Sequence, residues 1–534
     1  MSDSNLLRSN LTVASGTALS RVTGLLRIAV FAAVLGRSAL TDAYNQANAT
    51  PNLVYELLIG GVLSATLVPL FTRLRHEEDD HGEKAVRSVA LAATLVITII
   101  AVLAAPLIFR VYAATTSNEV DTDLYHEVGG TLAAFFLVQI FFYGLSAIAS
   151  AELQARRRFF AAAWAPAIGN AVVIASLLLV PEVAGDGTEA LGQVLTDDRL
   201  RLVLGLGATL GIAVMALSLV PSMVRAHIPL GVSLDLRHPA VRKLTALSGW
   251  ALGYVVANQL AIIVVQNVLV RSGEGNPTGY TNAYAFFVLP HGLLAMSIVT
   301  TFLPEMSQAV NDRRRDRFID RTGLGIRMVA LFTIPAGFGL FVLRRPIVGL
   351  ALQHGEYDAA DAQLASRALA GFALGLGAFS LYLFVLRAFY AHQDARTPCI
   401  INIVENVINV ILAIALYDRY GVLGIAAAFA IAYAISAVWS LQILGYKVTG
   451  FPLRSTFASL YRVLLASVVM AEIVWLVCRD LGGDAGREAL VRIVVGTVVG
   501  VVVYVAVLLV LRGPELDEVR RRFARSDGAV GSAP

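Results

Sequence analysis

The sequence feature that most constrains the fold is a series of apolar runs, each long enough to cross a lipid bilayer. A helical span needs about 20 apolar residues, and runs of this kind recur fourteen times along the 534 residues. Because hydrocarbon offers no hydrogen-bond partner to the backbone, such runs must form helices. We therefore predict an all-α polytopic membrane protein with about 14 transmembrane helices. The runs centre near residues 11–36, 42–72, 87–112, 128–153, 159–181, 200–224, 244–270, 279–309, 325–352, 363–391, 397–417, 420–445, 459–478 and 488–511.

Charged residues are scarce and lie mostly in the short segments between these runs. They make up 15% of the chain, against about 25% in soluble domains. With a cytoplasmic N-terminus, 28 of the 42 lysines and arginines fall on inside segments and 10 on outside segments, as the positive-inside rule requires. This bias predicts cytoplasmic N- and C-termini. The net charge of +4 does not indicate a nucleic-acid partner, because the charges lie in short segments between apolar runs. No cleavage site follows a short apolar core, so the first run is expected to be a retained helix.

A weak internal repeat predicts two related lobes. Leu58 to Pro69 resembles Leu293 to Pro304, and Gln154-Ala155-Arg156 resembles Gln393-Asp394-Ala395-Arg396. Both pairs lie six helices apart, a spacing typical of transporters built from repeated halves. We expect two pseudo-symmetric six-helix lobes plus two C-terminal helices. The predicted parts are residues 1–225 (helices 1–6), 226–445 (helices 7–12), 446–512 (helices 13 and 14) and a tail over 513–534.

The first apolar run contains two arginines, Arg21 and Arg27. A charged side chain at mid-bilayer costs about 2.5–3.5 kcal/mol on insertion scales, so its first interpretation is functional. The two arginines are six residues apart and point about 120° from each other on a straight helix, although a bend at Gly24 would let both face one cavity. Snorkelling to an interface, or pairing with a carboxylate, is the alternative.

The second run carries a polar stripe and an internal Pro51, which should kink the helix. Asp42, Asn45, Asn52 and Glu56 are spaced so that they share one helix face. Such a face must meet protein or water and not lipid. It is either the wall of a polar cavity or a hydrogen-bonded seam between helices, and Glu56 is a candidate ion partner for the arginines of the first run.

The eleventh run repeats this pattern. Asn402, Glu405, Asn406 and Asn409 stand at i, i+3, i+4 and i+7 and share one face. A membrane carboxylate among amides can bind a cation such as Na⁺ or carry a proton. A buried polar network that holds the second half together is weighed equally.

Other polar residues have simpler interpretations. His291, directly after Pro290, is expected to be a packing residue rather than a ligand. The run from Arg313 to Arg315 is expected to set topology and to contact anionic lipids.

No enzyme signature is present. We find no metal-spaced histidine cluster, no phosphate-binding glycine loop followed by lysine and no nucleophile elbow. Cys399 and Cys478 lie in apolar runs at no metal-like spacing. We therefore expect a protein that is not an enzyme and holds no cofactor or metal. Any transport would draw on an ion gradient, the membrane potential or downhill substrate flux.

The first two runs resemble the MurJ/MviN family of lipid II flippases, within the multidrug/oligosaccharidyl-lipid/polysaccharide exporter superfamily. The resemblance extends over nearly the whole chain. It rests on Ser20-Arg21, Gly24, Arg27, Gly36, Thr41-Asp42-Ala43 and Pro51-Asn52-Leu53, and further on Gly61, Ser64, Val68-Pro69, Leu289-Pro290, Gly292, Leu303-Pro304 and Ala395-Arg396-Thr397-Pro398.

The resemblance implies two lobes around a cationic cavity in the bacterial plasma membrane. The implied substrate is lipid II, the undecaprenyl-pyrophosphate-linked peptidoglycan precursor, moved from the inner to the outer leaflet by alternating access. Arg21 and Arg27 would contact the pyrophosphate, which arginine forks hold well. Ser20, Gly24, Asp42, Asn45, Asn52 and Glu56 would line or gate the cavity, and helices 13 and 14 would form a groove for the lipid tail.

The sequence departs from the family pattern at three places. Ile28, the pair Tyr55-Glu56 and Ala285 stand where relatives usually carry an aspartate, an arginine and another arginine. The alternatives are therefore export of another lipid-linked oligosaccharide or of cationic drugs, and a non-transporting scaffold that docks cell-wall synthesis proteins. An enzyme acting on polyprenyl phosphates is the most distant alternative.

Overall fold

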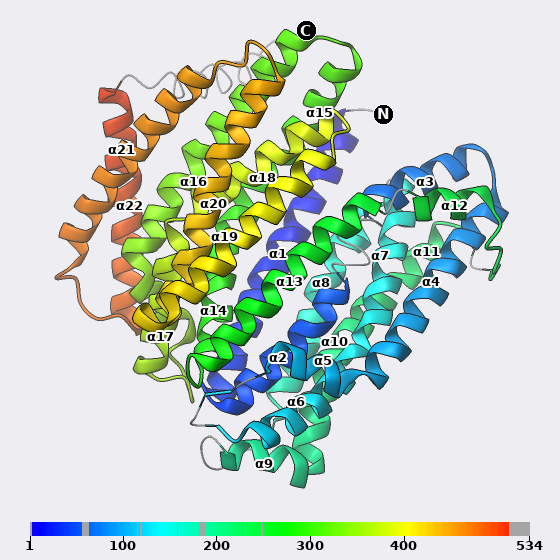
Figure 1. Ribbon diagram of the computed structural model, residues 1–534, viewed down its shortest axis with the longest axis horizontal. Coiled ribbons are helices and arrows are strands. Elements are labelled where there is room, and N and C mark those ends of the chain that lie inside the picture. Colours follow the sequence, from blue (N-terminus) through cyan, green and yellow to red (C-terminus); the bar gives the residue numbers. More distant parts are fainter. Residues whose placement is uncertain are drawn as a thin grey trace. The chain divides into compact units, whose positions relative to one another are not determined.

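The computed structural model describes residues 3–55, 64–114, 116–117, 120–156, 158–180, 188–229, 231–246 and 249–511. Within these ranges the side chains of residues 3–14, 17, 50, 52–55, 64–66, 69, 188–189, 243–246 and 249–255 lie outside the description. The described residues form helices joined by turns and short loops, without a strand. The predicted all-α fold is confirmed (Figure 1).

The chain divides into two compact units. The first covers Met1–Thr281 and His354–Asp361, and the second covers Asn282–Gln353 and Ala362–Pro534. The helices of the first unit are α1 (Asp3–Leu35), α2 (Ala39–Tyr55), α3 (Ser64–His76), α4 (Asp80–Leu103), α5 (Ala105–Tyr112), α6 (Thr122–Leu137), α7 (Gln139–Ala155), α8 (Phe159–Leu177), α9 (Thr188–Thr196), α10 (Asp198–Leu217), α11 (Val220–Arg225), α12 (Pro239–Ala246) and α13 (Gly249–Arg271).

The second unit begins within α14 (Asn276–Pro290) and continues with a π-helical turn, η2 (His291–Ala295). Its other helices are α15 (Met296–Asn311), α16 (Arg315–Leu352), α17 (Ala359–Ala373), α18 (Leu376–Ala391), α19 (Arg396–Tyr420), α20 (Val422–Lys447), α21 (Leu453–Cys478) and α22 (Gly486–Val510). The predicted lobe boundary near residue 225 and the separate part over 446–512 stay predictions. The predicted tail over 513–534 lies outside the described residues.

Every predicted apolar run contains helix. Eleven helical stretches of the described chain are long and apolar enough to cross a membrane, or twelve if the bent pair α17–α18 is one span. The apolar part of α13, Val256–Arg271, is shorter, and the predicted run over 42–72 includes residues outside the description. The count of fourteen therefore stays a prediction.

Several predicted runs are two helices rather than one. The run over 87–112 divides at Ala104, and the run over 128–153 divides at Val138. Pro106 lies in the first turn of α5, where its missing N–H costs nothing. Pro290, which lacks a backbone N–H to donate within the helix, lies directly before η2. Hydropathy reports the length of an apolar run but does not reveal where the helix breaks within it.

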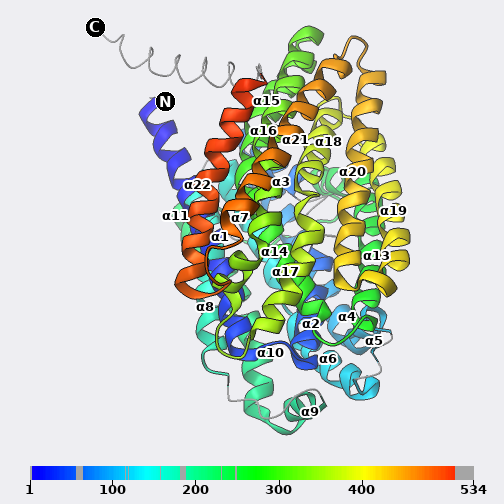
Figure 2. The same ribbon diagram turned by 90° about the vertical axis from the view of Figure 1, so that its left-hand side faces the viewer.

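Each unit has its own core. In the first unit, Tyr44 of α2 packs against Phe31 of α1 and Phe136 of α6, with ring centroids 4.9 Å apart in both pairs. In the second unit, Phe287, Phe372 and Phe429 form an aromatic cluster from α14, α17 and α20. Figure 2 shows α21 and α22 running beside α16.

Candidate functional site

Helix α1 carries the predicted pyrophosphate ligands and packs against α8. Asn170 of α8 donates from Nδ2 to the carbonyl of Ser20 at 3.3 Å and to the hydroxyl of Thr23 at 3.1 Å. Gly24 lies next to the same amide, since a Cβ on Gly24 would stand 3.7 Å from Asn170 Nδ2. Ser20 and Gly24 thus belong to the α1–α8 contact.

Arg21 and Arg27 differ in their surroundings. Helix α1 continues without a break through Gly24, and Arg21 is exposed whereas Arg27 is half-buried. Arg27 interacts electrostatically with the hydroxyl of Tyr44 on α2. Among the described residues, no carboxylate lies within ion-pair distance of either guanidinium. Glu56, the predicted partner, lies outside the described residues.

Asp42 is a buried carboxylate with three donors. Its side chain accepts hydrogen bonds from the backbone N–H of Gly275 at 2.6 Å, and from the backbone N–H and hydroxyl of Thr278 at 3.0 and 2.7 Å. Gly275 and Thr278 flank the first turn of α14, where backbone N–H groups have no partner within the helix. Asp42 therefore caps α14 across 233 or more residues of sequence.

The neighbouring side chains of α2 extend this contact. Asn45 donates from Nδ2 to the hydroxyl of Thr278 at 3.0 Å. Gln46 donates from Nε2 to Gln266 Oε1 of α13 at 3.1 Å. Of the two interpretations of the polar stripe, the hydrogen-bonded seam describes Asp42 and Asn45. The side chain of Asn52 lies outside the described residues.

A second set of contacts, which sequence reasoning missed, surrounds the turn between α1 and α2. Arg37 donates from Nε to Asp361 at 2.5 Å and from Nη1 to the carbonyl of Glu274 at 2.9 Å. The backbone N–H of Ala39 donates to Glu274 Oε1 at 2.7 Å. Burial lowers the pKa of Arg37, but the hydrogen bond and charge of Asp361 outweigh burial and hold that pKa above its ordinary value. We call residues 33–45, 274–278 and 354–361 the clasp.

Two glycines allow the backbones of the clasp to approach closely. Gly36 and Gly355 have φ angles of +59° and +60°, a conformation that suits glycine. A Cβ on Gly36 would lie 2.7 Å from the carbonyl oxygen of Glu356, and one on Gly355 would lie 2.2 Å from that of Ala33. Gly36 belongs to the family motif, so this signal was visible in the sequence, but its partner segment was not.

The polar face of α19 is buried and incompletely hydrogen-bonded. Glu405 is 1% exposed and Asn402 is fully buried. Asn406 donates to the carbonyl of Asn402 at 2.9 Å. Both carboxylate oxygens of Glu405, both side-chain polar atoms of Asn402 and Oδ1 of Asn409 have no hydrogen-bond partner among the described residues. A satisfied structural network would leave few such atoms, so this face suits a proton or a small cation.

His291 and Ala285 complete the predicted positions. His291 pairs through Nδ1 with the hydroxyl of Ser380 at 3.0 Å and stacks edge-on against Phe379; its interpretation as a packing residue stays a prediction that these contacts support. Ala285 is half-buried on α14. The groups of three or more histidine, cysteine or acidic residues that could hold a metal are absent from the described part of the chain.

Comparison with known proteins decides the family. The family model described as lipid II flippase MurJ matches residues 31–481, well over half of the chain. The chain belongs to the lipid II flippase MurJ family. This confirms the resemblance seen in the sequence, and the MurJ family together with the helical spans makes the chain a multi-pass membrane protein.

Individual MurJ relatives cover most of the chain. Lipid II flippase MurJ of Burkholderia cenocepacia is 28% identical over 399 residues, which are 74% of this chain and 75% of the relative. Probable lipid II flippase MurJ of Rhizobium meliloti is 26% identical over 541 residues, which cover 98% of this chain and 97% of the relative. A solved structure, lipid II flippase MurJ in an inward closed conformation, has a TM-score of 0.75 at 24% identity over 94% of this chain and 98% of that one. At this identity the solved structure shows the fold alone.

Proposed function

We propose that this protein is a lipid II flippase of the peptidoglycan pathway, which moves undecaprenyl-pyrophosphate-linked precursor from the inner to the outer leaflet. The observation that carries the proposal is the MurJ family match over residues 31–481. The relatives cited above bear the lipid II flippase name, so neither another oligosaccharide, nor drugs, nor a scaffold role is favoured. The proposed setting is the bacterial plasma membrane, with both termini cytoplasmic.

The proposed substrate contacts are Arg21 and Arg27. A guanidinium in an apolar segment needs an anion, and neither of these two pairs with a described carboxylate. A pyrophosphate accepts bidentate hydrogen bonds from arginine forks. Since Ala285 replaces one family arginine, these two side chains would carry a larger share of recognition than in typical relatives.

The clasp supports a role for Asp42 and Asn45 in gating. Alternating access requires one end of the transport path to close while the other opens. In this structure Asp42 ties α2 to the start of α14, and Arg37 ties the α1–α2 turn to Asp361. We propose that the clasp lies at one end of the transport path and that these hydrogen bonds are exchanged for water when that end opens.

Coupling to a cation or a proton is assigned to the α19 face. Glu405 has no hydrogen-bond partner among the described residues, and a buried carboxylate must be neutralised by a proton or by a cation. Na⁺, H⁺ or the membrane potential would then supply the energy for the return of the empty transporter. No nucleotide-dependent step is proposed.

Two kinds of partner are proposed. Cytoplasmic arginine clusters such as Arg313 to Arg315, all exposed, are proposed to contact anionic lipids. Cell-wall synthesis proteins that use lipid II are proposed as neighbours of the transporter at the membrane.

The test is depletion of the native protein and complementation with variants, with lipid II on the outer leaflet as the readout. We expect wild type to restore exposure of lipid II, and Arg21→Ala and Arg27→Ala to fail while still inserting into the membrane. Arg454→Ala, at an exposed arginine outside α1, is the matched control and should complement. Restoration by both α1 variants would remove the pyrophosphate assignment, and unchanged lipid II exposure after depletion would contradict the flippase function.

A further inference from the structure

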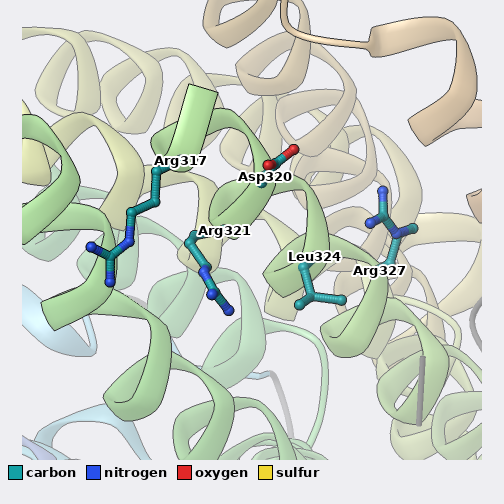
Figure 3. A pocket seen from close by; sticks show the side chains of 5 residues that line it. All are labelled: Arg317, Asp320, Arg321, Leu324 and Arg327. Atoms are coloured by element: carbon teal, nitrogen blue, oxygen red, sulfur yellow. The ribbon is translucent and has the colours of Figure 1, made fainter. Parts of the chain in front are cut away.

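The start of α16 borders a cavity whose lining residues belong neither to the clasp nor to the α1 arginines. The cavity has a volume of about 490 Å³, and the described residues that line it are Arg317, Asp320, Arg321, Leu324 and Arg327 (Figure 3). Spacings of three, four and seven residues place the first four on one helix face, and Arg327 extends that face by another turn. One helix thus contributes three arginines to the wall of the cavity, with Arg317 and Arg321 extending in one direction and Arg327 in another (Figure 3).

The charges in this cavity are unbalanced. Arg321 Nε lies 3.3 Å from Glu305 Oε2 of α15. Neither Arg317 nor Arg327 forms an ion pair with any residue that the structure describes. In Figure 3 the Arg317 and Arg321 side chains extend away from the exposed Asp320 carboxylate. After the Glu305 pair is counted, the cavity keeps an excess of positive charge that an anion would neutralise.

The position of the cavity along α16 indicates what kind of anion fits. Arg327 is twelve residues beyond Arg315, the first residue of α16, which is about 18 Å along the helix axis. Helix α16 is one of the candidate membrane spans, and Leu324 adds a buried apolar side chain to the wall. The site therefore runs from a polar helix end into an apolar segment, the environment of a lipid headgroup and the first carbons below it.

We propose that the Arg317–Arg321–Arg327 cavity binds the phosphodiester headgroup of an anionic membrane lipid. Arginine suits this role because its planar fork donates two parallel hydrogen bonds to phosphate oxygens. Three arginines against Asp320 of the lining and Glu305 beside it leave a net charge of +1, which a single negative charge on the ligand matches. The proposal stands independently of lipid II transport, because it concerns a resident lipid and not the cargo.

The test measures lipid binding to the purified full-length protein in detergent. Short-chain phosphatidylglycerol is the anionic probe, short-chain phosphatidylcholine is the zwitterionic probe, and inorganic phosphate is the soluble probe. The test variant is Arg317→Gln combined with Arg327→Gln. The matched control is Arg237→Gln combined with Arg454→Gln, which removes the same charge from exposed residues that do not line this cavity.

We expect the test variant to lose at least tenfold in affinity for phosphatidylglycerol, and the control to lose less than threefold. Phosphatidylcholine and inorganic phosphate should bind weakly to all proteins. Equal losses in both double variants would overturn the proposal, because the charge of the whole surface would then explain binding. Tight binding of inorganic phosphate would overturn the lipid assignment.

A conservative variant guards against misfolding. Arg327→Lys keeps the charge but removes the fork, so we expect an intermediate loss of affinity with an unchanged elution volume in gel filtration. Wild-type affinity in both Arg327→Lys and the Arg317→Gln, Arg327→Gln variant would exclude the cavity as the site.

Discussion

At the scale of single residues, Asp42 shows how a polar residue in an apolar run can have a structural reason. It is 4% exposed and receives three hydrogen bonds from Gly275 and Thr278. Its spacing along α2 was readable in the sequence, but its partners lie more than 230 residues away. Periodicity reports which helix face a residue occupies but not what lies opposite that face. The sequence therefore could not distinguish a hydrogen-bonded seam from the wall of a polar cavity.

Asp42→Ala should therefore lower stability as well as transport. It leaves the backbone N–H groups of Gly275 and Thr278 buried without an acceptor, at about 1–3 kcal/mol for each group. Thermal unfolding of the purified protein measures the effect. Asp480→Ala, at a carboxylate that is 81% exposed, is the control and should leave the Tm unchanged; an equal Tm for both variants would contradict the capping role.

A pH dependence is expected at the loop between α18 and α19. Burial raises the pKa of Asp394, but hydrogen bonds from Lys447 and Thr397 outweigh burial and lower it to about 2. The unfolded value is about 3.9. A lowered carboxyl pKa stabilises the fold above the unfolded pKa, and this contribution disappears as the pH falls through the folded pKa.

Stability should thus fall between about pH 4 and pH 2, by about 1–2 kcal/mol after discounting for solvent around the half-exposed Lys447. Lys447→Gln removes one cause of the lowered pKa. The Tm of this variant should depend less on pH than that of wild type across the same window. If the Tm of Lys447→Gln and that of wild type depended on pH in the same way, the Asp394–Lys447 ion pair would not contribute to stability.

At the scale of elements, helices α4 and α7 are joined by buried ion pairs. Arg87 lies 2.9 Å from Glu152, and Arg156 lies 2.7 Å from Glu83. Arg87 also donates to the carbonyls of Pro229 and Gly231 in the loop after α11. Figure 1 shows this end of the first unit, where α3, α4, α7, α11 and α12 meet. The sequence placed Arg87 and Arg156 on inside segments by charge bias, which cannot reveal a buried partner.

Glu152→Gln should destabilise the first unit by about 3–5 kcal/mol, because it leaves Arg87 buried without a counter-charge. Glu77→Gln is the control, since Glu77 forms an exposed pair with Arg73 that should contribute under about 1 kcal/mol. Denaturant titration of the two variants compares the losses. A similar small loss in both would show that the buried pair is not needed.

At the scale of the whole molecule, the all-α class and the approximate helix positions were predictable, because apolar length is a local property. The clasp could not be predicted, since it depends on contacts between distant segments. The breaks within runs and the Arg317 cavity could not be predicted either, because apolar length does not show where a helix breaks and arginine spacing does not show that a cavity lies beside the helix. The charge bias places Arg37 among the ten outside cations, but it does not reveal the hydrogen bonds of Arg37 to Asp361 and Glu274. Arg21 and Arg27 were found because a charge inside an apolar run is conspicuous by itself.

Transport should stop when the clasp is held shut. Asn45 and Thr278 are in side-chain contact, so Asn45→Cys combined with Thr278→Cys should form a crosslink under mild oxidation. We expect lipid II exposure to fall on oxidation and to recover on reduction. The two single cysteine variants are the controls, and an oxidised double variant with normal transport would show that this contact does not open.

Coupling at α19 should be visible as a change in ion dependence. Glu405→Gln keeps the volume but cannot ionise, so transport by this variant should lose its dependence on pH or Na⁺. Glu472→Gln, an exposed carboxylate on α21, should retain the wild-type dependence. The readout is lipid II translocation in vesicles with imposed gradients, and equal ion dependence in wild type and Glu405→Gln would remove the assignment.

The π-helical turn after Pro290 has a consequence for the helix beyond it. In η2 the backbone N–H of Met296 bonds to the carbonyl of His291, five residues back, so this turn holds one residue more than an α-helical turn. If the same residues were wound as a regular α-helix, every residue beyond this turn would be rotated by about 100° relative to α14. Glu305 would then leave Arg321, so the winding of this short segment, as much as its composition, determines which side chains α15 presents to α16.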